Sequence, residues 1–354
     1  GVDSDLDAPL DATLVIFDGF ANINRYWRDH YLIDRERELL LEAQEQLLYD
    51  VASVYYTIRR AEAQVEVLDS SIALQQQRVD DARGREEAGL SRSLDVAQSE
   101  AQVSATRVQR IEAHRQVIQA RLFLAYLTNA PVSQMQLDDQ FDPENTDDFL
   151  ALLNEAFQFR SELRATENAI RAAQHEVEVA LGQYYPGVTI DLSAFLYRES
   201  APDERTWAGV LQVNLPIFNA GRIHADVRTA WSFLREALLL DSQTRRRIRN
   251  EVEQDLANLS ASIERLRELE NSLRVSRLAF DQSEASYRAG LATNLDRVAA
   301  QDALLQAQLA FRSEEIDQKL LRIELLRATG VLRETLLESS TTQPTSNPTT
   351  RSGR

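Results

Sequence analysis

Few residues of this chain stand at spacings that could support chemistry. His175 and Glu178 lie three residues apart in a segment expected to be helical, so they could share one helix face and supply half of a metal site. No second pair completes it, and the ordinary interpretation is a solvated helix surface. Cysteine is absent, which excludes disulfides, thiolate metal sites and a cysteine nucleophile. Hydrolase, phosphate-loop, dinucleotide and zinc-protease motifs are absent as well. We therefore expect no catalytic residue, cofactor or metal.

Two aspartates occupy matching places after two short glycine-containing turns. Asp95 follows Gly89 by six residues, and Asp296 follows Gly290 by six. Carboxylates gathered at one level of a structure attract cations. An aspartate at the start of a helix is also stabilised by the helix dipole. The residues alone leave both interpretations open.

An internal repeat organises the chain. Three segments of the first part recur in the second part at one offset of 201 residues: LVIFDGF at 14–20 and LPIFNAG at 215–221, AGLSRSLD at 88–95 and AGLATNLD at 289–296, and the pairs Thr128–Asn129 and Thr329–Gly330. Three matches in one register indicate a duplication.

Each copy contains a long segment without proline in which apolar residues recur every seven positions. This seam consists of Val51, Ile58, Val65, Ile72 and Val79 in the first copy, and of Val252, Leu259, Leu266, Leu273 and Phe280 at the same offset. A heptad seam is typical of paired helices. A helix of some 65 residues would be about 100 Å long. Whether each long arm is one helix or two stacked ones stays open.

The repeat predicts four parts. Residues 1–128 hold a strand at about 9–17, a long helix, a tip turn at 88–92 and a return helix from Ser93. Residues 129–184 are an acidic linker followed by one helix from Phe149 to Gln183. Residues 185–330 repeat the first part behind a β-hairpin at 188–215, with their tip turn at 289–293. Residues 331–354 are predicted to be a disordered tail, because they are rich in Ser, Thr and Pro.

The predicted strands have one apolar and one polar face. In Val188–Tyr197 alternate residues are apolar, while Asp191 lies on the other face; Gln212 and Asn214 do the same in the second strand of the hairpin. This pattern suits a transmembrane barrel strand and equally a soluble sheet packed on helices. Too few strands are present for one chain to close a barrel, so a membrane interpretation requires an oligomer.

Composition narrows the class further. Gly (11) and Pro (8) are scarce, and the net charge of −17 disfavours nucleic acid as a partner. No run of about 18 apolar residues encodes a transmembrane helix. The expected fold class is mainly α with a small β part, in which long antiparallel helical hairpins are duplicated.

Three ordered segments resemble the TolC family of outer-membrane efflux and secretion channels: YYPGVTIDLSAF at 184–195, LPIFNAGRIHADVRTA at 215–230 and ASYRAGLATNLDRVAAQDALLQAQ at 285–308. The resemblance implies a homotrimer in the outer membrane of a Gram-negative bacterium, extending into the periplasm. Its strands would build a transmembrane β-barrel in contact with lipid, and its hairpins an α-barrel. The duct would be passive, in a tripartite efflux pump or a type I secretion system, with a periplasmic adaptor and an inner-membrane transporter as partners. The repeat predicts a further strand and helix, at least about 55 residues, before residue 1.

The resemblance also assigns roles to residues. The adaptor-docking tips would be Ala88, Gly89, Leu90, Ala289, Gly290 and Leu291. Asp95, Asp296 and Tyr287 are candidates for a pore constriction, in which Tyr287 would hydrogen-bond Asp95 of the neighbouring hairpin. Asp191, Gln212 and Asn214 are candidates for the barrel lumen. The first rival is a soluble periplasmic coiled-coil adaptor or scaffold, and the second is a helical enzyme.

Overall fold

The computed structural model describes residues 7–131, 148–198 and 207–341. The chain divides into two compact units, one of residues 1–42 with 161–247 and the other of residues 43–160 with 248–354. Residues 132–147 of the predicted linker, residues 199–206 inside the predicted hairpin, and the tail beyond residue 341 lie outside the described residues.

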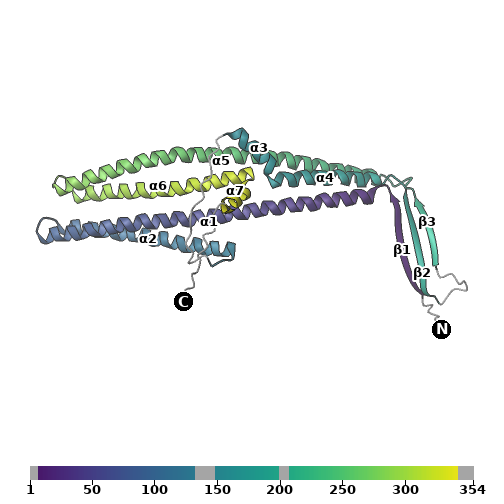
Figure 1. Cartoon of the computed structure of the whole chain (residues 1–354), viewed down its shortest axis with the longest axis horizontal. Coiled ribbons are helices and arrows are strands. Elements are labelled where there is room, and N and C mark those ends of the chain that lie inside the picture. Colours follow the sequence, from purple (N-terminus) through teal and green to yellow (C-terminus); the bar gives the residue numbers. More distant parts are fainter. Residues whose placement is uncertain (1–6, 132–147, 199–206, 342–354) are drawn as a thin grey trace, which may run out of the picture. The chain divides into compact units, whose positions relative to one another are not determined.

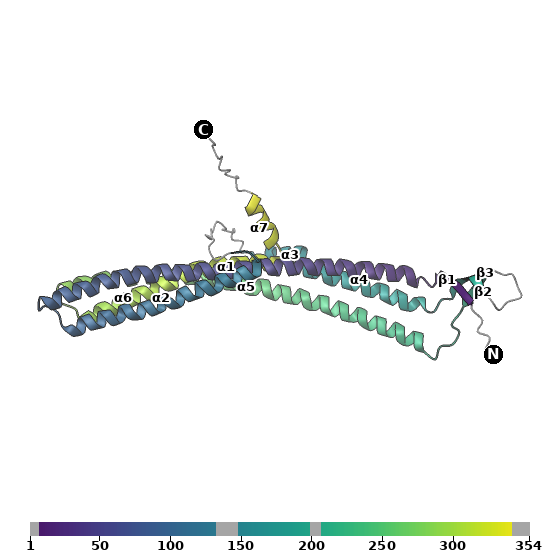
Figure 2. The same cartoon turned by 90° about the horizontal axis from the view of Figure 1, so that it is seen from below.

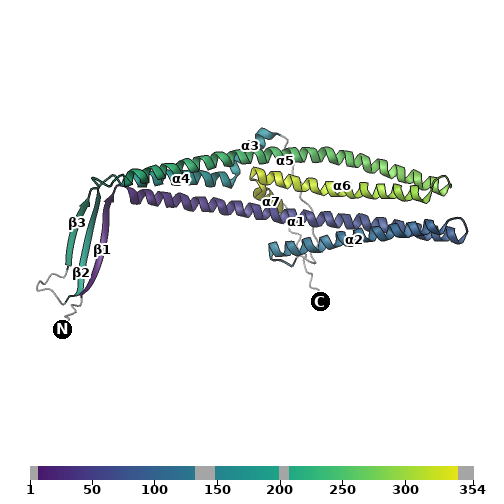
Figure 3. The same cartoon turned by 180° about the vertical axis from the view of Figure 1, so that it is seen from behind.

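Three strands form an antiparallel sheet in the first unit (Figure 1). β1 (Asp7–Asp18), β2 (Gly187–Arg198) and β3 (Trp207–Asn214) follow the order β1-β2-β3, which is also visible from behind in Figure 3. Paired residues point to the same face of a sheet. The register pairs Leu14 with Ile190 and Ile190 with Leu211, so one face is apolar across all three strands.

The apolar face of this sheet is open. Leu10, Leu14, Leu211 and Val213 are each more than half exposed, and β3 is exposed along its whole length. No helix among the described residues covers this face.

Helix α4 (Ser161–Gly182) lies between the first turns of α1 (Ala21–Glu87) and of α5 (Arg222–Arg288) in the same unit, as Figure 1 shows. Val177 and Ala180 of α4 pack with Ala230 and Leu234 of α5 in a buried cluster. On the other side of α4, Arg28 of α1 donates a hydrogen bond of 2.7 Å to Glu176. One apolar side and one polar side therefore fix α4 to its two neighbours.

The helices of the two copies have the same lengths and the same spacing. α1 and α5 have 67 residues each, and the return helices α2 (Ser93–Thr128) and α6 (Asn294–Thr329) have 36 each. Both boundaries of α5 and of α6 lie 201 residues after their counterparts in α1 and α2. Each long arm is one continuous helix, which answers the question that the sequence left open. Figure 2 shows the turns that join α1 to α2 and α5 to α6.

The predicted seam is the buried face of both long helices. Ile58 and Val79 are at most 1% exposed, as are Val252 and Leu259, and the other seam positions are partly buried. In the second unit Ile58 packs with Leu124 of the return helix. The fold class predicted from the sequence, mainly α with duplicated hairpins and a small sheet, is confirmed.

The single helix predicted from Phe149 to Gln183 is wrong. Two helices, α3 (Phe149–Phe159) and α4, meet at Arg160, whose backbone is extended (ψ 115°). The Arg160 side chain is buried and pairs with Glu251 at 2.9 Å, while its Nη1 also donates to the Ala328 carbonyl. The break therefore coincides with a buried guanidinium whose partners lie far along the chain.

The predicted tail also needs correction. Its first residues form helix α7 (Leu332–Thr341). Leu332 is fully buried in a cluster with Tyr56 and Ile323, and Leu336 packs against the same cluster. Burial of these two leucines stabilises a helix in a segment whose composition indicated disorder. No helix within residues 7–131, 148–198 and 207–341 is both long enough and apolar enough to span a membrane.

Candidate functional site

The two hairpin tips have the same backbone geometry. Gly89 and Gly290 adopt φ of 74° and 75°, in the left-handed region that glycine enters without strain. At the first tip Leu90 N–H donates to the Arg85 carbonyl and Gly89 N–H to the Glu86 carbonyl, and the second tip repeats both bonds. This is a Schellman end to the long helix.

The leucine after each tip glycine lies in solvent. Leu90 is 78% exposed and Leu291 is 83% exposed. In a Schellman motif the residue at this position often makes an apolar contact with the last turn of the helix. These two leucines leave most of their surface available, so each tip presents one free apolar side chain.

Asp95 and Asp296 both cap the start of a return helix. The Asp95 carboxylate accepts hydrogen bonds from the backbone and side chain of Arg92 and from the hydroxyl of Ser91. Asp296 accepts from the backbone N–H and the hydroxyl of Thr293, whose hydroxyl accepts from the Asp296 N–H in return. The helix-start interpretation of these aspartates therefore has a structural basis.

Hydrogen bonding favours the charged form of both carboxyls. Burial alone would raise the pKa of Asp95, but the hydrogen bonds from Arg92 and Ser91 outweigh it and hold the pKa below its ordinary value. The hydrogen bonds from Thr293 lower the pKa of Asp296. Both side chains therefore carry a negative charge at neutral pH.

The two aspartates differ in their surroundings in spite of the repeat. Asp95 is buried, and its carbonyl accepts a hydrogen bond of 3.1 Å from the side chain of Asn294, at the start of the other return helix. Asp296 is exposed. Any ring of carboxylates formed by copies of the chain would therefore consist of two unequal sets.

Tyr287 lies between two cations. The guanidinium of Arg297 sits 4.2 Å from the centre of the Tyr287 ring, and that of Arg85 sits 5.2 Å from it. Such cation–π contacts hold an aromatic ring in place. Among the described residues of a single chain, no hydrogen bond joins Tyr287 to Asp95 of the other hairpin, and a role for Tyr287 in a constriction stays a prediction.

Polar contacts between the hairpins were not predicted. Arg78 of α1 is buried, donates to Gln301 of α6, and lies 3.0 Å from Glu284 of α5. Gln102 of α2 donates to Asp302 of α6. Each partner is about 200 residues away along the chain, and an arginine beside a heptad seam carries no signal of that partner.

The three lumen candidates lie on the polar face of the sheet. Gln212 pairs with Thr189, and Asn214 with Gly187. Asp191 accepts a hydrogen bond of 2.7 Å from the hydroxyl of Thr13 on β1. These polar residues lie on the face opposite the apolar one, and their face also carries Val15 and Val210.

Comparison with known proteins identifies the family. The sequence pattern of outer membrane efflux proteins matches residues 4–130 and 152–331, most of the chain. The chain belongs to the outer membrane efflux protein family. This family consists of transport channels rather than enzymes, and membership places the protein in the outer membrane of a Gram-negative bacterium, as predicted.

Curated relatives are longer than this outer membrane efflux protein. It is 24% identical over 293 residues to the toluene efflux pump outer membrane protein TtgC of Pseudomonas putida, a match of 80% of this chain and 60% of the relative. It is 30% identical over 243 residues to the pyoverdine export outer membrane protein OpmQ of Pseudomonas aeruginosa, a match of 64% of this chain and 50% of the relative. The chain thus spans less than two thirds of their length.

Solved structures of the family have the same fold. The outer membrane protein VceC of Vibrio cholerae superposes with a TM-score of 0.81 at 20% identity, over 92% of this chain and 79% of that one. The CmeC outer membrane channel of Campylobacter jejuni gives a TM-score of 0.80 at 15% identity, over 97% and 76%. At these identities the likeness concerns the fold.

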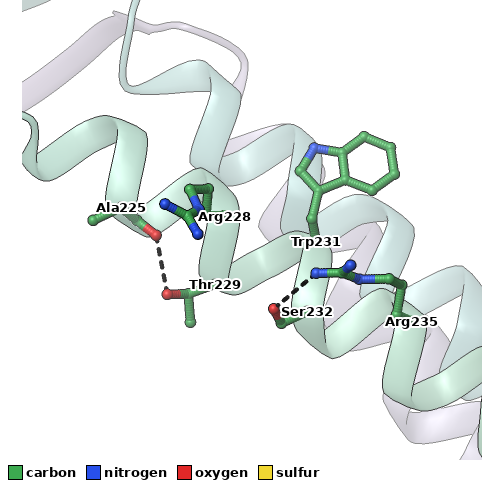
Figure 4. A pocket seen from close by; sticks show the side chains of 6 residues that line it. All are labelled: Ala225, Arg228, Thr229, Trp231, Ser232 and Arg235. Carbon is green, nitrogen blue, oxygen red and sulfur yellow. Dashed lines mark hydrogen bonds between the residues drawn. The ribbon is translucent and has the colours of Figure 1, made fainter.

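In this efflux protein, α5 carries a free face near the sheet. A cavity of about 640 Å³ is lined by Ala225, Arg228, Thr229, Trp231, Ser232 and Arg235, all of one helix (Figure 4). By the repeat offset, Ala225, Thr229 and Ser232 correspond to Asn24, Arg28 and Tyr31. Those three residues of α1 contact His175 and Glu176 of α4. The same position on α5 has no helix on it within the described residues.

Proposed function

We propose that the protein is a protomer of a homotrimeric outer-membrane channel, the passive exit duct of a tripartite efflux pump or a type I secretion system. The observation that carries this proposal is the open sheet, with an apolar face, a polar face and unpaired outer edges on β1 and β3. Unpaired strand edges cannot be satisfied in lipid. Strands from other copies would pair with these edges and close a barrel, with Asp191, Gln212 and Asn214 in its lumen.

The free face of α5 is a second candidate for a contact between copies. Its counterpart on α1 holds a helix, and a helix of another copy of the full-length protein would occupy the place on α5 in the same way. The apolar side chain of Trp231 is about half exposed along this stretch of α5. Its burial between copies would favour association.

Energy for transport would come from a partner, because the sequence carries no phosphate-binding loop. TtgC is named as the outer-membrane component of a toluene efflux pump. By analogy, we propose that this protein works with an inner-membrane transporter and a periplasmic adaptor.

Mass measurement tests the channel proposal. The full-length protein, extracted from membranes in detergent, should have the mass of three chains and should conduct ions when it is inserted into a planar lipid bilayer. A protein that is water-soluble without detergent, and is a monomer or dimer, would contradict the channel and favour the coiled-coil adaptor or scaffold.

The tip leucines offer a separate test of the adaptor. A photo-crosslinking amino acid in place of Leu90 or Leu291, introduced in living cells, should attach to a periplasmic adaptor. The matched control is Val108, an apolar residue on the side of α2 that is 66% exposed. A crosslinker there should give no adaptor product, and equal products from all three positions would remove the assignment of the tips.

A further inference from the structure

A second cavity lies in the first unit, where α4 separates α1 from α5. Its volume is about 520 Å³, within the range of sites that hold drug-sized molecules. Residues of all three helices line it, among them Leu32 of α1, Ala172 of α4, and Phe233 and Glu236 of α5. It is therefore a groove along α4, distinct from the single-helix cavity of Figure 4.

Small residues on the middle helix make the groove hollow. Ala169, Ala172 and Ala173 of α4 and Ala237 of α5 form its floor, while Leu32, Phe233 and Leu240 stand at its sides. Phe233 is 55% exposed and Leu240 is 51% exposed, so these apolar walls are open to a ligand. An apolar body of matching size would bury them and gain free energy roughly in proportion to the area covered.

One carboxylate that lines the groove has no ion-pair partner among the described residues. Arg28 donates to Glu176 at 2.7 Å and to Asp29 at 2.8 Å, so these three side chains form one network. Arg35 is paired with Glu36 outside the groove. Glu236 makes no ion pair within the described residues, and it stands one turn from Phe233 and Leu240 on α5. The groove thus combines apolar walls with an uncompensated negative charge.

We propose that this groove binds a lipophilic organic cation. The apolar body lies over the alanines of α4, between Leu32, Phe233 and Leu240, and the positive charge lies next to the Glu236 carboxylate. An anion of the same shape is repelled by Glu236. The site adds a binding step in the channel wall to the conduit proposed above, and it does not depend on the trimer or on the adaptor.

Two probes of the same shape and opposite charge test this. The full-length protein in phosphatidylcholine nanodiscs is dialysed to equilibrium against tetraphenylphosphonium or tetraphenylborate, and binding to empty discs is subtracted. We expect saturable binding of one tetraphenylphosphonium per protomer, at least tenfold tighter than tetraphenylborate. No saturable binding above empty discs, or equal affinity for the two ions, overturns the proposal.

Variants locate the site. Glu236→Gln should bring the affinities for the two ions to within a few-fold of each other. Glu253→Gln, an exposed acid on the same helix outside the groove, should leave the tenfold preference intact. Ala237→Trp fills the groove from α5 and should abolish saturable binding. Ala169→Phe fills the groove from α4 and replaces Ala237→Trp in the test if that variant does not assemble. Retained binding in a correctly assembled, filled variant also overturns the proposal.

Discussion

Asp255 is a buried carboxyl on α5 whose surroundings resist its negative charge. It is 8% exposed, and both Glu324 of α6 and Glu251 of α5 lie near it. Burial and the charge of Glu324 raise the pKa of Asp255 to about 6, against the opposing effect of Arg327 and Arg160. A charged Asp255 is therefore less stable in the folded protein than in water.

This residue makes stability depend on pH. Below about pH 4 Asp255 is protonated in both the folded and the unfolded protein, so it does not lower the free energy of unfolding. As the pH rises from about 4 to 6 the unfolded chain loses the proton first, so the folded state loses stability and stays lower above pH 6. After allowance for solvent screening the loss is about 1–2 kcal/mol.

We therefore expect Asp255→Asn to raise the melting temperature of the full-length protein at pH 7.5 relative to the unmodified protein, and to leave a smaller difference at pH 4. Thermal unfolding at the two pH values measures this. Asp281→Asn, on an exposed part of the same helix, is the control and should give no pH-dependent difference. An Asp255→Asn variant with the same melting difference at both pH values would mean that the carboxyl is not destabilised.

At the scale of elements, two glycines with the same backbone conformation end helices in different surroundings. Gly89 and Gly330 have φ of 74° and 77°. A Cβ at Gly89 would meet nothing within 4 Å, whereas a Cβ at Gly330 would lie 3.0 Å from the backbone N of Arg160 and the backbone C of Phe159. Gly330 therefore allows the end of α6 to approach the junction of α3 and α4.

The two alanine variants separate backbone strain from steric contact. Gly89→Ala should cost about 1 kcal/mol, from the left-handed conformation alone. Gly330→Ala should cost a further ~1–3 kcal/mol, because backbone atoms must move to admit the methyl group. Thermal unfolding of the two full-length variants measures the difference. Equal losses of stability in the two variants would show that the backbone at the junction of α3 and α4 moves to admit the methyl group without a measurable free-energy cost.

The same junction shows where prediction from sequence succeeds and fails. The tip turns were predicted at 88–92 and 289–293, and the helices end and begin at those bounds, because turn glycines and capping residues act on their own neighbours. The break at Arg160 was missed, since it depends on Glu251 and Ala328, and α7 was missed, since burial of Leu332 depends on Tyr56 and Ile323. These partners are distant along the chain.

The candidate site also has features that the local sequence predicts and contacts that it does not predict. The tip turns and the two capping aspartates could be found from a local pattern repeated at one offset. The contact of Arg78 with Glu284 and Gln301 could not, because the repeat predicts which residues correspond and not which ones touch. Contacts between the two hairpins arise only when both copies pack together.

At the scale of the whole molecule, duplication has produced two hairpins whose tip aspartates lie in different surroundings. Asp95 is buried at the contact between the return helices, and Asn294 bonds its carbonyl. Asp296 has the same capping geometry and faces solvent. If the tips constrict a channel, Asp95 acts by holding the hairpins together, and Asp296 is the carboxylate available to passing ions.

This difference predicts opposite electrical effects for two matched variants of the full-length trimer in a planar bilayer. Asp95→Ala removes the acceptor of the Arg92 and Ser91 hydrogen bonds, so the start of α2 loosens beside Asn294 and the resting leak conductance should rise several-fold. Asp296→Ala removes an exposed charge and should leave the leak nearly unchanged while it lowers the preference for cations over anions. Because both variants lose the same type of helix cap, a general loss of stability would raise the leak in both. Unchanged conductance in Asp95→Ala would rule out a closing role for this residue, and unchanged ion preference in Asp296→Ala would place its carboxylate outside the path of the ions.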